Sequence, residues 1–355
     1  MKLEISEIVE GIKRLTPKRT IKIMEVCGTH TVAIARSGIR ELLPKEINLV
    51  SGPGCPVCVT PQSYIDKAIW LSKQKDIIIT TFGDLMRVPG SERSLALAKM
   101  EGSDIRVLYS PVQSLEIAEA NPSKLIVLLA VGFETTIPTI SGTLEIALRR
   151  NIKNIFIFSA HKIVPPALKV LASSKELMID GFILPGHVSA VIGIKPYEFL
   201  AREYNKACVI SGFEPLHILE GIFLILAQIH KNNFYIANQY KSTVDYEGNV
   251  KAQKSISKFF DLTDSVWRGI GNIPRSGLTL KCEYNFFDIE DKIQFPEIES
   301  REPTGCRCGD VLKGLIEPIE CPLFGRLCTY ENPVGACMVS SEGSCAAYYK
   351  YRKRV

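Results

Sequence analysis

The chain has 355 residues, 46% hydrophobic and 23% charged, a composition typical of a globular protein rather than a disordered or collagen-like one. Its 43 basic and 38 acidic residues give a formal net charge of +5, and the one dense basic run is the terminal KYRKRV, so we expect no nucleic-acid partner. The apolar runs LIVLLAVGF and GIFLILA are shorter than the ~20 residues that span a bilayer, and the N-terminal segment does not resemble a signal peptide. We therefore expect a cytoplasmic protein without a membrane partner.

The predicted elements begin with an amphipathic helix and continue as alternating strands and helices. Apolar residues at helical spacing mark the first helix, which spans Ile5 to Leu15. From residue 20, eight β-rich runs are each followed by a turn and an amphipathic stretch: TIKIMEV, INLVS, DIIITT, DIRVLYS, KLIVLLAV, NIFIFSA, GFILP and ACVIS. Such alternation predicts an α/β fold with parallel sheets, arranged as two Rossmann-like βαβ domains.

We expect three domains. The segment SPVQSLEIAEANPSK separates two series of strands, so residues 1–118 form the first α/β domain and residues 119–235 the second, closed by a helix from Pro215 to about His230. Residues 236–355 lack the βα rhythm at first, and the last fifty of them carry six of the eleven cysteines. They are expected to form a connector and a small irregular domain that a metal cluster stabilises.

Chemically versatile side chains follow several of the predicted strands. They are Cys27 and His30, Cys55 and Cys58, Asp84, Glu134, His161, His187 and Glu214. Each carboxylate could equally cap a helix, and each histidine could equally be a packing residue. Because ligands bind beyond the carboxyl ends of parallel strands, however, their joint occurrence predicts a functional site at that edge, to which we assign His30 and Glu134 together with the cysteines.

The pair Cys55 and Cys58 lies at the entrance to a predicted helix. Two thiols separated by two residues can close a small-ring disulfide, and a helix N-terminus lowers a thiol pKa, so we predict a redox dithiol. Half of a zinc site is the alternative, but a zinc ribbon requires a second such pair. Cys27, a thiol at a strand end with His30 one turn further on, is suited to bind iron or copper or to act as a nucleophile. A buried inert cysteine is the other interpretation.

The C-terminal cysteines are Cys306, Cys308, Cys321, Cys328, Cys337 and Cys345. Four thiolates from irregular loops suit a [4Fe–4S] cluster, and these wide spacings match neither a ferredoxin run nor paired zinc knuckles. We favour Cys321, Cys328, Cys337 and Cys345 as ligands, because Pro and Gly constrain the turns around them. Structural zinc is the alternative.

Taken together, the motifs CGTHT, GPGCPVCVTP, TFGDLMRVPGS, GFETT, PGHVS and CPLFG, followed by PVGACMVSSEGSCAAYY, resemble the HypD family of [NiFe]-hydrogenase maturation proteins. The resemblance extends from Cys27 to Tyr349. It implies two α/β domains and a [4Fe–4S] domain, and a complex with the small chaperone HypC, whose N-terminal cysteine would share an iron ion with Cys27. It also implies that cyanide arrives from HypE, as a thiocyanate on that partner's C-terminal cysteine.

The resemblance implies that Cys27 is a ligand of the iron ion. This iron would carry CN and CO groups while Fe(CN)2CO is assembled on it. Cys55 and Cys58 are the expected redox pair, which the cluster would recharge. Whether such a protein is an enzyme by itself is left open. Two other functions remain: a cluster-dependent dithiol–disulfide oxidoreductase, which leaves Cys27 and His30 without a role, and an assembly scaffold whose cluster is purely structural.

Overall fold

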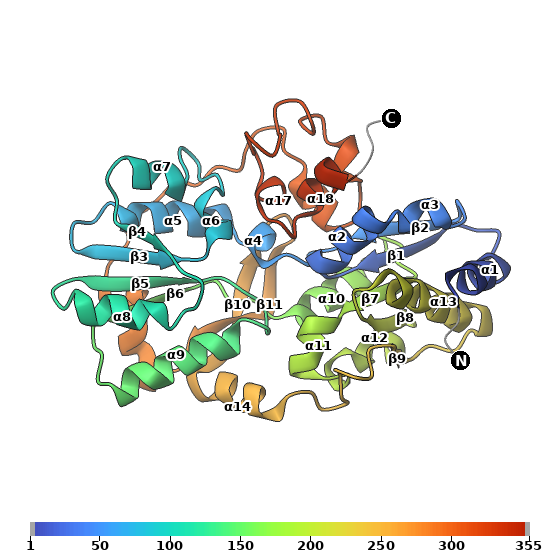
Figure 1. Cartoon of the computed structure of the whole chain (residues 1–355), viewed down its shortest axis with the longest axis horizontal. Helices are drawn as coiled ribbons and strands as arrows, with labels where there is room; N and C mark the ends of the chain where they lie inside the picture. The colour runs from blue at the N-terminus through green and yellow to red at the C-terminus, as the bar shows by residue number, and fades with distance from the viewer. Residues whose placement is uncertain (1–3, 352–355) are drawn as a thin grey trace.

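The computed structural model describes residues 4–351 and contains two parallel sheets, a hairpin and a cysteine-rich C-terminal segment. Figure 1 shows the sheets side by side along the longest axis, with the C-terminal segment above their junction. The first sheet, in the order β2-β1-β7-β8-β9, consists of β1 (Ile21–Glu25), β2 (Ile47–Ser51), β7 (Gly181–Pro185), β8 (Ala207–Ser211) and β9 (Ile236–Asn238). The second, in the order β4-β3-β5-β6, consists of β3 (Ile77–Thr81), β4 (Ile105–Val107), β5 (Leu125–Ala130) and β6 (Ile155–Ser159).

The predicted α/β class with parallel sheets is confirmed, and each of the eight predicted strands forms. Every residue of β3, β7 and β8 is buried, as expected for parallel strands that are covered on both faces. The three-residue strand β9 was not predicted from the sequence, since its apolar run is too short to stand out from the turns around it.

The division between the sheets does not coincide with the predicted boundary at residue 118. The chain leaves the first sheet after β2, builds the whole second sheet, and returns after β6 to add β7 next to β1. Residues 1–118 therefore contribute strands to both sheets. Alternating hydrophobicity identifies strands but carries no information on which strands pair, and the β1–β7 pairing joins segments more than 150 residues apart.

Helices fill the connections between strands. Those next to the strands are α1 (Ile5–Leu15), α2 (Gly28–Ser37), α3 (Ile39–Leu42), α4 (Pro56–Val59), α5 (Gln62–Ser72), α6 (Gly83–Met86), α7 (Leu95–Met100), α8 (Gln113–Ala120), α9 (Ile137–Arg149), α10 (Val164–Ser173), α11 (Gly186–Ile192), α12 (Glu198–Arg202) and α13 (Pro215–Lys231). The predicted helices at residue 5 and at Pro215 are confirmed. Helix α13 begins with its proline at the first turn and ends at Asn232, which adopts the left-handed conformation typical of a helix end.

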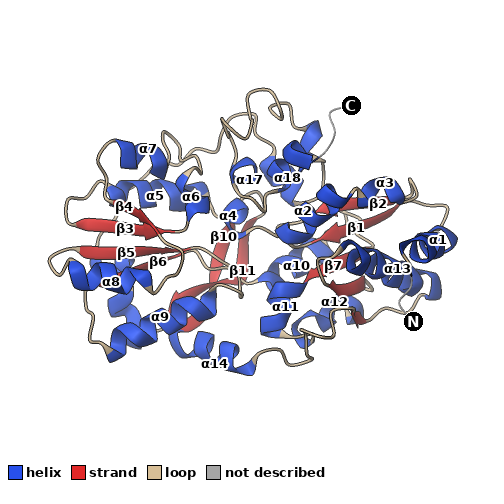
Figure 2. Cartoon of the chain, in the orientation of Figure 1, coloured by secondary structure: helices blue, strands red, loops and turns tan. Residues whose placement is uncertain are grey.

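A β-hairpin occupies the region where the sequence suggested an irregular connector. Strands β10 (Phe260–Trp267) and β11 (Gly271–Leu280) pair antiparallel after α14 (Val250–Phe259), and Figure 2 shows them between the two sheets. The buried Lys162, which follows β6, donates hydrogen bonds from Nζ to Ser265 Oγ (2.7 Å) and to the Val266 carbonyl (2.8 Å). The hairpin is thus attached to the end of the second sheet.

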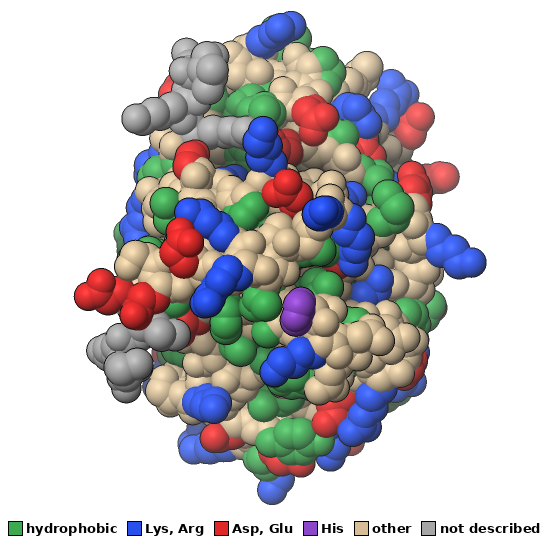
Figure 3. Space-filling view, turned by 90° about the vertical axis from the view of Figure 1, so that its right-hand side faces the viewer, with side chains coloured by type: hydrophobic (Ala, Val, Ile, Leu, Met, Phe, Trp, Pro, Cys, Tyr) green, Lys and Arg blue, Asp and Glu red, His purple; other side chains and the backbone are tan. Residues whose placement is uncertain are grey.

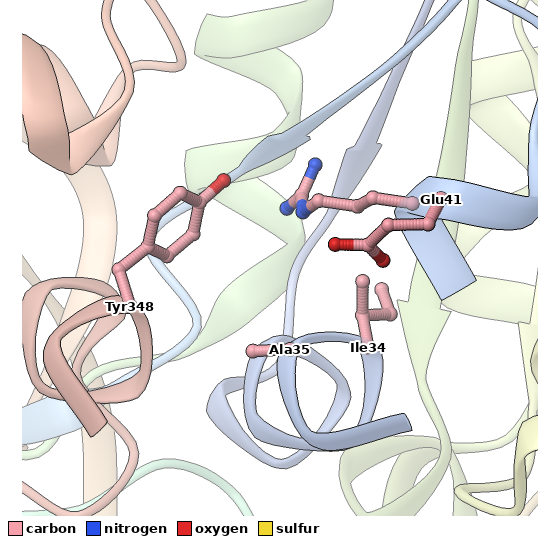
Figure 4. A pocket seen from close by; sticks show the side chains of 5 residues that line it. Ile34, Ala35, Glu41 and Tyr348 are labelled. Carbon is pink, nitrogen blue, oxygen red and sulfur yellow. The ribbon is translucent and has the colours of Figure 1, made fainter. Parts of the chain in front are cut away.

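The C-terminal segment is irregular. It contains the short helices α15 (Ile289–Lys292), α16 (Cys308–Leu312), α17 (Ala336–Val339) and α18 (Ser344–Tyr351) and the 3-10 turns Cys282–Phe287 and Pro318–Glu320. A further 3-10 turn, Lys195–Tyr197, precedes α12. Helix α18 packs on α2, and α17 packs on α4. Figure 4 shows Tyr348 of α18 facing Ile34 and Ala35 of α2 across a cavity of about 220 Å³. The C-terminal segment therefore packs against the helices that follow Cys27 and Cys55.

The surface is mixed in character. On the face in Figure 3, the described basic and acidic side chains are interspersed rather than gathered into a patch of one sign. Within residues 4–351, none of the helices is long and apolar enough to cross a membrane.

Candidate functional site

The loop after β1 and the loop after β2 are in close contact. Cys27 is the residue that precedes α2, and the amide of Gly28 donates to the Gly54 carbonyl (3.1 Å). A Cβ added to Gly54 would lie 2.4 Å from the Cys27 nitrogen, so only glycine permits this approach. The thiol of Cys27 is therefore presented beside the loop that carries Cys55.

Cys55 and Cys58 are joined by a disulfide, with their Cα atoms 5.3 Å apart. Cys55 occupies the cap position of the short helix α4, and Pro56 follows in the first turn, where a missing N–H costs nothing. Both sulfurs are buried. The structure thus brings together the three cysteines that the sequence placed at strand ends.

Carboxylates surround Cys27. Burial, and then the neighbouring Glu342, raise the pKa of the Cys27 thiol to about 12. Beneath it, Glu25 accepts hydrogen bonds from Thr31 Oγ1 (2.6 Å) and from the Cys27 amide (3.4 Å), while burial raises the pKa of Glu25 to about 7. Without a metal, Cys27 is therefore a neutral thiol, and a metal that binds it must displace the proton.

His30 is fully buried on α2. Its Nε2 lies 3.2 Å from the Ser211 carbonyl and 3.1 Å from the Gly212 carbonyl, and two acceptors require that this nitrogen carries the proton. Nδ1 then holds a lone pair, and it has no hydrogen-bond partner within residues 4–351. Burial lowers the pKa of His30 to about 4, so the imidazole is neutral. His187 lies nearby, since its ring stacks on Phe213, against which the His30 ring packs at a tilt.

Glu134 and His161 lie at the end of the second sheet. Glu134 Oε1 accepts from the Val164 amide (2.9 Å), and Oε2 is buried with no partner among the described residues; burial raises the pKa of Glu134 to about 7. Glu134 also lines a largely apolar cleft of about 750 Å³ between α10, α14 and the hairpin. Burial lowers the pKa of His161 to about 3, and its ring meets Phe260 edge-on.

Tyr197 is a further buried titratable residue in the neighbourhood of Glu134 and Cys27. Its side chain is fully buried, and burial together with nearby Glu134 and Cys27 raises its pKa well above the usual value. Asp84 is exposed at the start of α6, where it accepts a hydrogen bond from Ser340 Oγ (3.5 Å). Glu214 occupies the cap position at the start of α13, but its side chain accepts no capping hydrogen bond from the helix.

The six C-terminal cysteines line one small cavity. Cys308 Sγ and Cys337 Sγ lie 2.6 Å apart. Burial and the nearby thiols of Cys308, Cys345 and Cys321 raise the pKa of Cys306 to about 12. A cavity lined by thiols is the donor set that a [4Fe–4S] cluster uses, in which the four thiolates bind four different irons.

The two cysteine groups adjoin. Cys58 Sγ lies 4.0 Å from the carbonyl of Ala336, the residue before Cys337. The buried Arg268 lies close to both groups. Its amide donates to the Val59 carbonyl and its Nε to the Thr60 carbonyl (both 2.8 Å), at the end of α4. The next residue, Gly269, packs directly on Gly309, which follows Cys308.

Sequence reasoning missed four residues of this site: Glu25, Tyr197, Arg268 and Glu342. Thr29 Oγ1 donates to Glu342 Oε1 (2.9 Å), and a Cβ on Gly28 would collide with Glu342, so this glutamate closes over the Cys27 loop. Glu25 is a charged residue at the end of strand β1, directly after the apolar Ile23 and Met24, which is a signal that the sequence did offer. The other three become neighbours of the thiols only through tertiary contacts.

The chain is similar to known proteins over nearly its full length. Residues 4–352 match the family model described as "HypD: Hydrogenase formation hypA family". The chain belongs to the HypD family. It is 43% identical over 343 residues to the hydrogenase maturation factor HypD2 of Bradyrhizobium diazoefficiens, covering 94% of this chain and 90% of that protein. It is 42% identical over 358 residues to the hydrogenase maturation factor HypD of Escherichia coli, covering 99% of this chain and 96% of the relative.

An archaeal protein is equally similar. A putative hydrogenase expression/formation protein of Methanocaldococcus jannaschii is 43% identical over 350 residues, covering 98% of this chain and 97% of that protein. The resemblance seen in the motifs therefore holds over nearly the full length of the chain, including the segments without recognisable motifs. Membership of the family, predicted from those motifs, is confirmed.

Proposed function

We propose that this protein is a hydrogenase maturation factor on which an iron ion receives its cyanide and carbonyl ligands. The observation that carries the proposal is that three sets of cysteines meet at one junction: Cys27, the Cys55–Cys58 pair and the six cysteines that line the C-terminal cavity. The nearly full-length similarity to proteins named hydrogenase maturation factors supports the proposal that the assembled iron group is destined for a hydrogenase. A HypC-like chaperone and a HypE-like cyanide donor are the proposed partners.

In this proposal Cys27 is the iron ligand. The iron is cargo, so the residues around it must bind it and release it. The neighbouring carboxylates make that possible, because a buried thiol beside Glu25 and Glu342 holds its proton until a cation replaces it. The neutral imidazole of His30, with a lone pair on Nδ1, offers a second donor or hydrogen-bond acceptor in the same loop.

Cys55 and Cys58 supply electrons. Cleaving the S–C bond of a thiocyanate to give a thiolate and cyanide consumes two electrons, and oxidising two thiols to a disulfide releases two electrons and two protons. The pair lies next to Cys27, so reduction can occur where the cyanide is received. Glu134, a buried carboxyl group with a pKa near 7, is the proposed proton carrier.

A [4Fe–4S] cluster in the C-terminal cavity would provide electrons one at a time. We propose Cys321, Cys328, Cys337 and Cys345 as its ligands. In support of this set, Cys337 contacts Cys345 and lines the same cavity as Cys321 and Cys328. Cys306 also lies close to Cys321 and Cys345, and Cys308 Sγ lies 2.6 Å from Cys337 Sγ, so a set in which Cys306 replaces Cys337 is the alternative.

An infrared spectrum tests the assembly site. The wild type and Cys27→Ala are each purified anaerobically with the HypC-like partner. Cys282→Ala is the matched control, because Cys282 is an exposed free cysteine. Cyanide and carbonyl stretching bands are expected in the wild type and the control and absent from Cys27→Ala. Bands that persist without Cys27 would contradict the proposal.

A cluster-dependent dithiol–disulfide oxidoreductase is a second candidate, favoured by the contact between Cys58 and Ala336. It predicts steady reduction of a small disulfide by the protein when an artificial one-electron donor is present, and equal activity in Cys27→Ala. A Cys27→Ala protein that still turns over disulfides, combined with wild-type protein that never shows cyanide bands, would favour this alternative.

A further inference from the structure

The apolar cleft that Glu134 lines has no role in the proposed assembly of iron. Its volume of about 750 Å³ falls in the range of about 300–1,000 Å³ that small-molecule sites occupy. Its walls come from α10, α11, α12, α14 and the β10–β11 hairpin. Helices α11 and α12 pack on the first sheet, the hairpin is attached to the end of the second, and α14 packs on both α9 and α11 (Figure 1). The cleft thus lies at a junction between two parts of the fold, where ligand sites are common.

The walls of the cleft are preformed. Four of the lining residues are prolines: Pro165, Pro166, Pro196 and Pro274. A proline has a fixed φ and no long side chain that could collapse into the space. Lys169, which also lines the cleft, is held by other groups, since its Nζ lies 3.5 Å from the Glu203 carboxylate and over the ring of Phe199. A ligand can therefore enter without a rearrangement of the walls.

A hydrogen-bonding group without a partner lies at the buried end of the cleft. Glu134 is 3% exposed, and its Oε1 accepts from the Val164 amide. Its Oε2 is buried and has no hydrogen-bond partner within residues 4–351. Leaving a buried oxygen unpaired is costly, and a hydrogen bond with a ligand removes that cost.

Positive charge prevails at the open end. Arg275 is exposed, and its φ of 53° lies in the left-handed region that arginine rarely adopts. Its amide donates to Asp264 Oδ1 (2.9 Å), which holds the turn in this conformation. Arg275 and Lys169 face one exposed carboxylate among the lining residues, that of Asp261. The cleft therefore combines a buried carboxyl group, an apolar middle and a mouth with a net positive charge.

We propose that this cleft binds an amphipathic small-molecule anion. An uncharged hydrogen-bonding group of the ligand pairs with Glu134 Oε2, an apolar body lies along the proline-rich walls, and an anionic group lies at Arg275. The proposal goes beyond the proposed function and does not depend on it, because neither a cysteine nor the iron takes part. A ligand that contacts both α12 and the hairpin also links the parts of the molecule that belong to the two sheets.

Two dyes with the same ring system test the site. Anilinonaphthalenesulfonate carries an N–H group, an apolar body and a sulfonate, and the uncharged phenylnaphthylamine lacks only the sulfonate. Equilibrium dialysis of each dye against the full-length, cluster-containing protein under anaerobic conditions measures the bound amount without interference from the colour of a cluster. The wild type should bind one molecule of the sulfonate dye per chain, and more tightly than the uncharged dye. A wild type without saturable binding of either dye would overturn the proposal.

Variants of the cleft locate the bound dye. Ser257→Trp places a large ring in the lining of the cleft from α14 and should abolish binding of both dyes. Lys254→Trp, on the same helix but outside the lining, is the matched control and should bind both dyes as the wild type does. Equal binding by Ser257→Trp and the wild type would place the dye elsewhere and overturn the proposal.

Two further measurements test the ends of the cleft separately. Arg275→Asn removes the charge and keeps a residue that tolerates the left-handed conformation, so the sulfonate dye should bind about fivefold more weakly and the uncharged dye equally well. Equal affinity of the sulfonate dye for both proteins would contradict the place of the anion. Infrared difference spectra on dye binding, recorded below the pKa of Glu134, should show a shifted carboxyl band that Glu134→Gln lacks. The absence of this band would contradict the pairing with Oε2. None of these measurements involves cyanide bands, so failure here and failure of the proposed function are distinguishable.

Discussion

The Cys27 loop and the six-cysteine segment both gather thiols, but on different kinds of backbone. Cys27 and Cys55 follow neighbouring parallel strands, β1 and β2, and each precedes a helix. The six C-terminal cysteines come from short helices and irregular loops that converge on one cavity. A sheet edge can hold reactive groups in place without a cofactor, whereas the C-terminal loops gain the most from a cluster that cross-links them.

Removing a proposed cluster ligand should therefore produce the largest effect. In Cys321→Ala we expect complete loss of cluster iron and sulfide, because Cys321 belongs to both ligand sets considered above. The C-terminal segment should then lose its packing on α2 and α4, while the sheets keep their secondary structure. Iron analysis, limited proteolysis and circular dichroism measure these outcomes. Full iron content in Cys321→Ala would show that the cavity does not use this thiol.

The packing of the two loops at the sheet edge can be disturbed without touching a thiol. Gly54→Ala places a methyl group 2.4 Å from the Cys27 nitrogen, so the loops must separate. Overpacking of this kind costs about 3 kcal/mol in the free energy of unfolding. Gly142→Ala in α9, where an added Cβ meets nothing within 4 Å, should be neutral or slightly stabilising. Urea unfolding of both variants tests this, and equal stabilities would contradict it.

These two regions also differ in how far the sequence revealed them. The strand ends of Cys27, Cys55 and Glu134 were predictable, because buried strands have a strong hydrophobic signal and their carboxyl ends are a known location for ligands. The pairing of β1 with β7 was not, and neither was the contact of Arg268 with the end of α4. Both depend on contacts between segments far apart in the chain, on which spacing and composition are silent.

The choice among the six C-terminal cysteines shows the same limit. Turn-forming Pro and Gly around Cys337 suggested a ligand, and the structure places Cys337 in a cavity with five other cysteines, in contact with both Cys308 and Cys345. In irregular loops the local sequence sets where the chain turns and leaves open which side chain enters the cavity. Ligand sets in such segments are therefore accessible only from three-dimensional contacts or from direct measurement.

The buried carboxyl group at the second sheet should give a measurable pH dependence. Burial raises the pKa of Glu134 from 4.5 to about 7, so the folded protein keeps a proton that the unfolded chain loses above pH 4.5. The stabilisation is complete below pH 4.5 and is lost as the pH rises through 7. Relative to Glu134→Gln, the wild type should lose on the order of 2 kcal/mol between pH 5 and pH 7.

The matched control for this comparison is Glu145→Gln on α9, a half-exposed carboxylate paired with Lys258. Urea titrations of the three proteins at several pH values provide the data. If Glu134→Gln and the wild type differ by a constant amount over this range, Glu134 is ionised throughout. It would then be unsuited to carry a proton at neutral pH.

The smallest effect is expected beneath Cys27, where one hydroxyl group supports a buried carboxyl. Thr31 Oγ1 donates to Glu25 Oε1 at 2.6 Å, and replacing it by valine keeps the shape but removes the donor. The loss of such a bond costs about 1 kcal/mol. Thr139→Val, at an exposed position of α9 where the hydroxyl group bonds only to the Thr136 carbonyl, is the control and should change stability less. Because Thr31 also lowers the pKa of Glu25, Thr31→Val should shift the carboxyl titration upward, as infrared difference spectra would record. An unchanged titration would mean that the hydroxyl group only fills space and that burial alone keeps Glu25 protonated beside Cys27.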